Sequence, residues 1–135
     1  MIESASEFVR LRTSENPDEY HRAAHDVASD EVWSDVLASY PEMAFWVAHN
    51  KTISLCIMEI LADSPDEDAR LMLAMKRKCP HHLLRRLALD KNESVRYAVA
   101  VNKKTPLDIL QILSSDEWET CASNARSRIN QLGSG

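Results

Sequence analysis

The stretch VRYAVAVNKKTPLDILQILSSD, residues 95–116, decides the fold because it recurs upstream in the chain. Residues 69–90 read ARLMLAMKRKCPHHLLRRLALD, at an offset of 26 residues and without a gap. The matching residues are Arg70 and Arg96, Ala74 and Ala100, Pro80 and Pro106, Leu84 and Leu110, Leu87 and Leu113, and Asp90 and Asp116. Self-similarity at such a period predicts stacked units of one supersecondary structure.

Earlier copies of the unit are weaker. A further step of 26 residues aligns Ala48 with Ala74 and Leu61 with Leu87, and Asn50 matches Asn102 two copies later. A fourth copy lies in residues 22–41 and is shifted by a deletion of about two residues. After Thr120 the pattern decays, as it does in a terminal cap. We therefore expect a single domain over residues 1–132 with repeats at 17–43, 44–68, 69–94 and 95–120, a cap at 121–132, and a linker or frayed tail at 133–135.

Each copy is predicted to form two short helices. In the best copy, Val95, Ala98 and Val99 share one helical stripe, and Ile109, Leu110 and Leu113 point inward from the second helix. Asn50 and Asn102 are expected to end the first helix in the left-handed conformation. Thr105 is expected to cap the second helix, with Pro106 at its first helical position.

The N-terminal part carries further helix starts. Residues 4–7, SASE, form a capping box that predicts a helix through Arg12. Asn16-Pro17 starts a helix to about Ala28, Ser29 caps one over residues 30–39, and Pro41 opens a fourth. Both glycines lie in the last three residues, which disfavours phosphate-cradling loops and a β-rich fold. The predicted fold is an all-α, right-handed α-solenoid of about four 24–26-residue helical pairs with terminal capping helices.

The stretch VRYAVAVNKKTPLDILQIL resembles a variant leucine-rich repeat, whose pattern runs VR, VAxN, TP and LxxL. Such units are relatives of HEAT and armadillo repeats. The resemblance covers residues 44–116, and more loosely 17–43, but one copy has Lys76 for the Asn and another has Ala44 and Ser54 for the Arg and Pro. It implies an α-solenoid with alternating α-helices and shorter, sometimes 3₁₀, helices, and no single function. One family member carries a cysteine-ligated iron–sulfur module; this chain has no matching cysteine cluster, and we expect no cofactor.

Composition predicts a cytoplasmic protein. The 135 residues contain 44% hydrophobic and 27% charged residues, with neither an apolar run of membrane-spanning length nor a signal-peptide stretch at the start. Cys56, Cys79 and Cys121 are odd in number and far apart, which favours free thiols. Cys121 falls in the core phase of Val95 and Ala69 and is expected to be buried.

Charge is distributed unevenly and gives two alternative binding surfaces. Residues 1–75 contain 5 Lys+Arg and 15 Asp+Glu, whereas residues 76–104 contain 9 and 2. The acidic candidates for contact with a partner are Asp26, Asp30, Glu31, Asp35, Asp66, Glu67 and Asp68. The alternative is an anion-binding ridge, formed by Lys51, Arg77, Lys78, Lys103 and Lys104, which recur at one phase and so at one edge of a solenoid. Lys76, His81, His82, Arg85 and Arg86 extend this ridge, and the opposite turns carry Asp63, Asp90, Asp116 and Glu117. Charged turns can also be merely solvated.

Other candidate sites are less specific. His21 and His25 lie four residues apart in HRAAH, as a metal site requires, but the third ligand is missing, and we predict no metal. Trp33 and Trp46 are assigned to the core, and Trp118 to neither core nor surface. Phe45, Leu71 and Tyr97 share a phase one step from the core stripe, which suits either packing between helices or an interface.

These observations predict a non-catalytic protein-binding helical-repeat module. Its specific form is an immunity- or inhibitor-type protein that neutralises a toxin or nuclease by masking a basic surface with the acidic N-terminal half. The alternative is a nucleic-acid- or phosphate-binding solenoid that uses the basic ridge, although the net charge of −5 argues against a general nucleic-acid binder. No catalytic constellation stands out, so an enzyme is not expected, and we expect no membrane partner.

Overall fold

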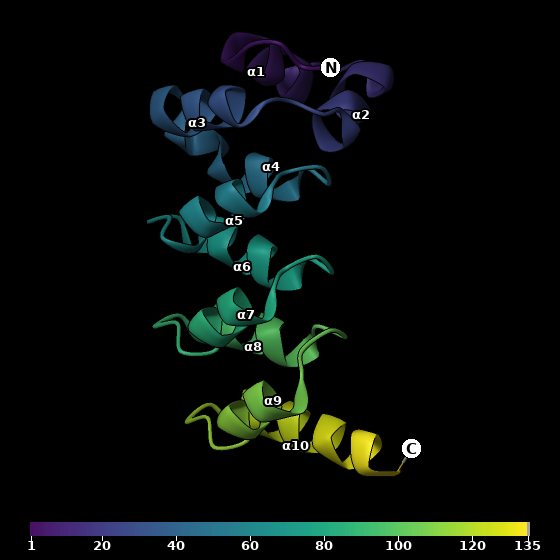
Figure 1. Cartoon of the computed structure of the whole chain (residues 1–135), viewed down its shortest axis with the longest axis vertical. Helices are drawn as coiled ribbons and strands as arrows, with labels where there is room; N and C mark the ends of the chain where they lie inside the picture. Colours follow the sequence, from purple (N-terminus) through teal and green to yellow (C-terminus); the bar gives the residue numbers. More distant parts are fainter. Residues whose placement is uncertain (135) are drawn as a thin grey trace. The chain divides into compact units, whose positions relative to one another are not determined.

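The computed structural model describes residues 1–134, without the side chain of Ser134, and the chain forms two compact units that meet between Leu73 and Ala74. Unit 1 contains α1 (Ala5–Thr13), α2 (Pro17–His25), α3 (Asp30–Ser39), the 3₁₀ turn η1 (Pro41–Met43), α4 (Ala44–His49), α5 (Leu55–Ala62) and most of α6 (Glu67–Met75). Unit 2 contains the end of α6, α7 (His81–Leu87), α8 (Glu93–Val101), α9 (Leu107–Leu113) and α10 (Glu119–Ser134). Over residues 1–134 the fold is all-helical apart from one isolated bridge between Ile2 and Ala28, which confirms the predicted all-α class (Figure 1).

The helix starts of unit 1 follow the sequence signals. The side chain of Ser4 accepts a hydrogen bond from the Glu7 N–H at the start of α1, and Ser29 accepts one from Val32 at the start of α3. Phe8 and Trp33 are fully buried and meet edge to face, with ring centroids 5.0 Å apart. This contact fixes α1 against α3 at the centre of the unit 1 core.

Two boundaries in unit 1 differ from the prediction. The helix α2 ends at His25, three residues before the expected end at Ala28. The residues beyond it are extended because the Asp26 carbonyl accepts a hydrogen bond from Asn50 and Ala28 bridges to Ile2. Pro41 opens a 3₁₀ turn, and α4 follows directly at Ala44.

The expected left-handed ends at Asn50 and Asn102 are wrong. Both residues are extended, with φ/ψ of −63°/134° and −67°/122°, and no non-glycine residue in 1–134 has a positive φ. Their side chains instead bind backbone of an earlier helix end. The Nδ2 group of Asn102 donates to the carbonyls of Ala74 and Lys76 at 2.7 and 3.0 Å. Asn50 donates in the same way to Ala23 and Asp26 at 2.9 and 3.0 Å.

The predicted cap of α9 is also wrong. Pro106, with an extended backbone, occupies the N-cap position and lacks a side-chain hydrogen bond to the helix. The hydroxyl of Thr105 is buried and donates to the Val99 carbonyl at 2.6 Å. Thr105 therefore binds the backbone of α8 and does not cap α9.

One face of α7 and one face of α9 are buried, and the leucines matched by the repeat lie on these faces. Leu83, Leu84 and Leu87 in α7, and Ile109, Leu110 and Leu113 in α9, are each at most 2% exposed. The chain ends in α10, which begins at Glu119 and continues through Gly133 and Ser134. The expected tail is therefore helical at these two positions, and Gly135 lies outside the described residues.

A buried ion pair holds α8 to the turn before α10. The Arg96 Nε atom lies 2.7 Å from an Asp116 carboxylate oxygen, and the two side chains are 11% and 5% exposed. Arg96 also donates to the Asp90 carbonyl at 2.8 Å. Burial alone would raise the pKa of Asp116, but hydrogen bonds from Arg96 and from the Trp118 N–H outweigh it, and the pKa lies below its usual value. The matching arginine of unit 1, Arg70, donates to Ser64 in the same way, at 2.7 Å.

Candidate functional site

The first four acidic candidates lie at the end of α2 and along α3. Asp26 is half-buried and pairs with Arg22 at 2.8 Å. Asp30, Glu31 and Asp35 are exposed on α3, and Asp30 accepts a hydrogen bond from the Ser54 hydroxyl at 2.8 Å. Asp30 therefore lies beside the start of α5.

The remaining acidic candidates lie at the other end of α5. Asp66 precedes α6 and accepts a hydrogen bond from the Asp68 N–H at 2.9 Å, and Glu67 and Asp68 form the exposed first turn of that helix. Asp30 lies at the start of α5, whereas Asp66 lies in the turn that follows its end.

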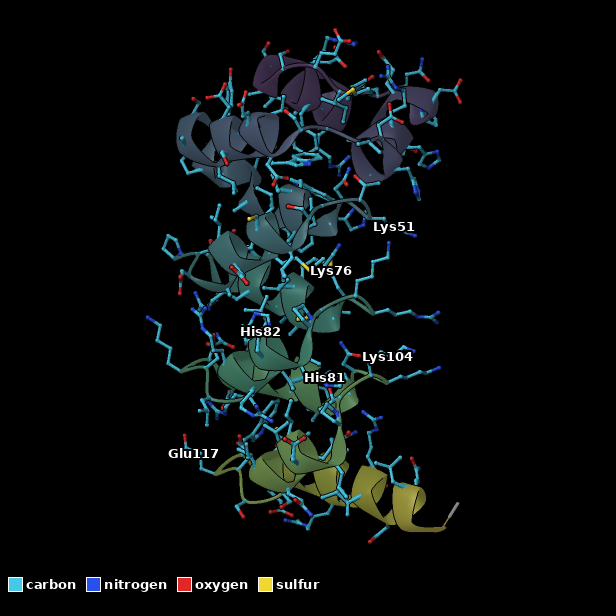
Figure 2. The ribbon with its side chains drawn as sticks, in the orientation of Figure 1. Lys51, Lys76, His81, His82, Lys104 and Glu117 are labelled. Atoms are coloured by element: carbon cyan, nitrogen blue, oxygen red, sulfur yellow. The ribbon has the colours of Figure 1, made fainter. Side chains whose placement is uncertain are left out.

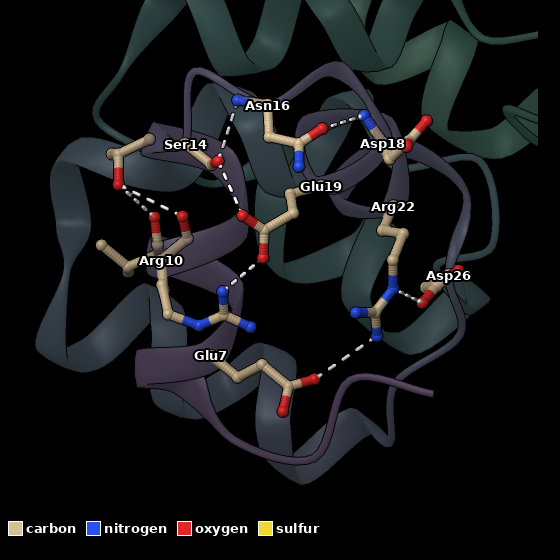
Figure 3. Close-up of polar contacts among 10 residues, drawn as sticks. Glu7, Arg10, Ser14, Asn16, Asp18, Glu19, Arg22 and Asp26 are labelled. Carbon is tan, nitrogen blue, oxygen red and sulfur yellow. Dashed lines mark hydrogen bonds and ion pairs between the residues drawn. The ribbon is translucent and has the colours of Figure 1, made fainter.

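Arginines of unit 1 neutralise acidic residues on α1 and α2. Arg10 pairs with Glu19, and Arg22 lies 3.7 Å from Glu7 in addition to its contact with Asp26 (Figure 3). Hydrogen bonds from Arg10 and from Ser14 hold the pKa of Glu19 below its ordinary value. In contrast, Glu31, Asp35 and Asp68 make no ion pair with any other residue in 1–134.

Unit 2 brings four of the basic candidates together. Arg77 and Lys78 follow α6, Lys103 and Lys104 follow α8, and all four side chains are exposed. The two turns are neighbours because Asn102, in the second, donates to Lys76, in the first. Lys104 and Glu117 extend from opposite sides of the unit, as the repeat phase predicted (Figure 2). Lys51 lies in unit 1, where it is exposed and follows α4.

Arg128, in α10, makes contacts with the turn after α8 like those that Asn102 makes with the turn after α6. It lies 26 residues after Asn102 and donates to the carbonyls of Ala100 and Asn102 at 2.9 and 2.5 Å. Those carbonyls lie 26 residues after Ala74 and Lys76, the acceptors of Asn102. Asn102 and Arg128, which lie 26 residues apart, therefore each donate hydrogen bonds to backbone carbonyls 26 to 28 residues earlier in the chain.

The four histidines singled out in the sequence lie on α2 and α7, and two of the three cysteines are buried. His21 and His25 are both exposed on α2, and His81 and His82 are exposed at the start of α7. Among residues 1–134, no group of three or more His, Cys, Asp or Glu side chains is arranged to hold a metal ion. Cys79 and Cys121 are buried, and burial raises their pKa values to about 12 and about 11. Cys56 is an exposed free thiol.

The aromatic residues divide differently from the prediction. Trp33 is in the core as expected, but Trp46 is half-buried, and the guanidinium of Arg12 lies 3.5 Å above its ring. Trp46 lines a pocket of about 320 Å³ in unit 1 together with Arg12, Tyr20, His21, Ala23, Ala24 and His49. This pocket was not predicted, because its residues come from three helices that meet only through tertiary packing. Phe45, Leu71 and Tyr97 are each half-buried.

Within the described part of the chain, no helix is both long enough and apolar enough to cross a bilayer. Comparison of the chain with protein-family models, with curated proteins and with solved structures finds no match.

Proposed function

We propose that this chain is a cytoplasmic α-solenoid of about four helical-pair repeats that binds another protein without catalysing a reaction. We further propose that the exposed acidic side chains of unit 1 contact a basic surface of that partner. The observation that carries this proposal is the charge of unit 1, which contains 15 acidic and 5 basic residues.

Ion pairs of unit 1 engage carboxylates on α1 and α2 and at the end of α2. Arg10 and Arg22 bind carboxylates on α1 and α2, and Arg12 stacks on Trp46. Within residues 1–134, no cation pairs with the carboxylates on α3. Glu31 and Asp35 are one helical turn apart and exposed, while Trp33 and Val36 on the same helix are buried. The solvent face of α3 therefore presents two adjacent negative charges on a helix anchored by its core side.

An acidic surface of this kind suits an inhibitor or immunity-type protein. Charge complementarity accelerates diffusional encounter and disfavours partners of the wrong sign. A nuclease or a toxin with a basic active site would be steered to α3 and covered by it. The charge asymmetry between unit 1 and unit 2 supports this specific form of the proposal.

The experiment compares three immobilised proteins in a lysate of the source cells: the wild type, a Glu31→Lys/Asp35→Lys variant, and a Lys103→Glu/Lys104→Glu control. We expect the wild type and the control to retain one partner in stoichiometric amount, with a basic isoelectric point, and the α3 variant to lose it. Retention of that partner by the α3 variant would contradict the proposal.

A second function has a specific observation in its favour. Arg77, Lys78, Lys103 and Lys104 lie on adjacent turns of unit 2, and within residues 1–134 their side chains form no ion pair. Such a cluster suits phosphate groups of a nucleic acid. Binding of unselected duplex DNA that weakens steeply with salt, and is lost in the Lys103→Glu/Lys104→Glu variant, would favour this function over the first.

A further inference from the structure

The pocket of unit 1 is built from three helices. Arg12 comes from the end of α1, Tyr20 and His21 from α2, and Trp46 and His49 from α4. Aromatic rings pack against one another along these walls: Trp46 meets His49 edge to face at 5.6 Å, and Tyr20 meets His21 at 4.9 Å. None of these contacts belongs to the charged surfaces described above.

The guanidinium of Arg12 is a cation without an acceptor. It lies over the Trp46 ring, its Nε atom is buried, and it makes no hydrogen bond or ion pair with any residue in 1–134. The neighbouring Arg10 and Arg22, by contrast, both bind carboxylates. Within residues 1–134 its positive charge contacts the face of the Trp46 ring and no carboxylate, although the unit is rich in acidic residues. A guanidinium that lines a pocket and has its donors free favours an oxyanion as the ligand.

The remaining walls favour a flat apolar group. Ala23 and Ala24 contribute methyl groups, and Tyr20 and Trp46 contribute ring surface. A cavity of about 150 Å³ already accepts benzene. The volume of about 320 Å³ leaves room for one ring and a charged substituent next to Arg12.

The walls are held in place before any ligand binds. Glu19, which directly precedes Tyr20, binds Arg10 and the Ser14 hydroxyl on the α1 side, and Arg22 reaches Glu7 of α1 (Figure 3). These contacts fix α1 against α2 on both sides of Tyr20 and His21. A preorganised pocket loses less entropy on binding than one that must form around its ligand.

We propose that this pocket binds a small ligand composed of a planar ring and an oxyanion, with Arg12 pairing with the oxyanion and Tyr20 and Trp46 contacting the ring. The inference is independent of the protein-binding function, because its residues are not those of the acidic α3 face or of the basic turns. Carboxylate and phosphate share the chemistry that Arg12 recognises.

The test uses the whole chain and four probes of one ring size: benzoate, phenyl phosphate, neutral benzyl alcohol and cationic benzylamine. Binding is measured by calorimetry, and its location by the indole N–H signals of Trp33, Trp46 and Trp118 in a nitrogen-15 spectrum. We expect benzoate or phenyl phosphate to bind at least about tenfold more tightly than benzyl alcohol and to shift the Trp46 signal. Whichever of benzoate and phenyl phosphate binds with the higher affinity identifies the preferred oxyanion as carboxylate or phosphate. Equal binding of the neutral ring, a preference for benzylamine, or an unmoved Trp46 signal would overturn the proposal.

Two variants locate the interaction. Arg12→Gln should weaken the preferred anion by roughly tenfold or more, whereas Lys51→Gln, which removes one exposed positive charge from the same unit, should leave the affinity within about twofold. Equal losses in both variants would mean that the ligand responds only to net charge and would contradict the assignment. If Arg12→Gln does not fold, Arg12→Lys keeps the charge but removes the planar donor pair, and it should also weaken binding; unchanged affinity would contradict the role of Arg12.

Discussion

At the scale of single residues, side chains that bind main-chain carbonyls hold the ends of neighbouring helices together in each unit. Asn50 and Asn102 are at most 6% exposed, and each uses both amide hydrogens on carbonyls of an earlier helix end. The Asn102 side-chain oxygen also accepts a hydrogen bond from the Lys104 N–H at 2.9 Å. Each asparagine thus satisfies backbone groups that the end of a helix leaves without partners.

Replacement of Asn102 by alanine is therefore expected to be costly. Asn102→Ala leaves the carbonyls of Ala74 and Lys76 and the N–H of Lys104 without this partner, and should destabilise the protein by about 2 kcal/mol or more. Urea unfolding measures the effect. Lys103→Ala, an exposed neighbour in the same turn, should change the free energy of unfolding by less than about 0.5 kcal/mol. Equal effects of the two substitutions would show that the asparagine does not hold the turns.

The ion pair of Arg96 and Asp116 makes stability depend on pH. Because the folded-state pKa of Asp116 lies below its ordinary value, the stability contributed by the carboxylate is complete above the unfolded-state pKa and is lost as pH falls through the folded-state pKa. Asp116→Asn should therefore be less stable than the wild type at about pH 7, and the difference should shrink below about pH 4. Urea unfolding across this range provides the measurement, and a difference that stays constant with pH would exclude the assigned ion pair.

Some residue roles were visible in the sequence and others were not. The matches of Arg96 with Arg70 and of Asn102 with Asn50 marked these positions as repeated, but spacing does not reveal a hydrogen-bond acceptor on another helix. Local capping rules predicted a left-handed end at Asn102, whereas the structure uses its amide across turns. The cation over Trp46 escaped prediction for the same reason, since Arg12 and Trp46 meet only through tertiary packing.

At the scale of helices, apolar periodicity and capping residues account for most of the observed elements. Ser4 and Ser29 cap the helices that they were expected to cap, because their hydroxyls reach N–H groups three residues later in any helix that starts there. The end of α2 could not be predicted locally. It is set by Asn50 and Ile2, which bind residues that would otherwise continue the helix.

The second helix of the best copy gives a direct test of packing. Leu110 in α9 is fully buried, whereas Leu107 in the same helix is 46% exposed. Leu110→Ala should lower the free energy of unfolding by about 2–5 kcal/mol, the usual cost of truncating a buried leucine. Leu107→Ala serves as the matched control and should cost less than about 1 kcal/mol. Thermal or urea unfolding compares them, and a loss below about 1 kcal/mol for Leu110→Ala would mean that α9 is not packed through this face.

At the scale of the whole molecule, charge is the property that distinguishes the two units. Unit 1 contains 5 basic and 15 acidic residues, whereas unit 2 contains 11 and 6, so their net charges are −10 and +5. The composition of the sequence already showed this asymmetry. It did not show that Asp30 lies beside the start of α5, or that the basic turns of unit 2 are neighbours.

The stability of the chain should not depend on a metal ion. His21 and His25 lack a third ligand among residues 1–134, so prolonged chelation should leave the melting temperature unchanged. A clear fall in melting temperature that zinc restores in the wild type, and that is absent in His21→Ala, would instead identify the pair on α2 as a metal site. Differential scanning fluorimetry with and without chelator is sufficient for this comparison.

We propose that the acidic face of unit 1 recognises a basic protein. The rate at which the chain associates with the captured partner tests this recognition most directly. Rates are measured by stopped flow at several ionic strengths for the wild type, Glu31→Lys/Asp35→Lys and Lys103→Glu/Lys104→Glu. We expect the α3 variant to associate roughly tenfold more slowly than the wild type at low salt, and this difference in rate to narrow as salt rises. Its thermal stability should be nearly unchanged. An unchanged rate for the α3 variant, together with a collapse of the rate for the unit 2 variant, would contradict the proposal.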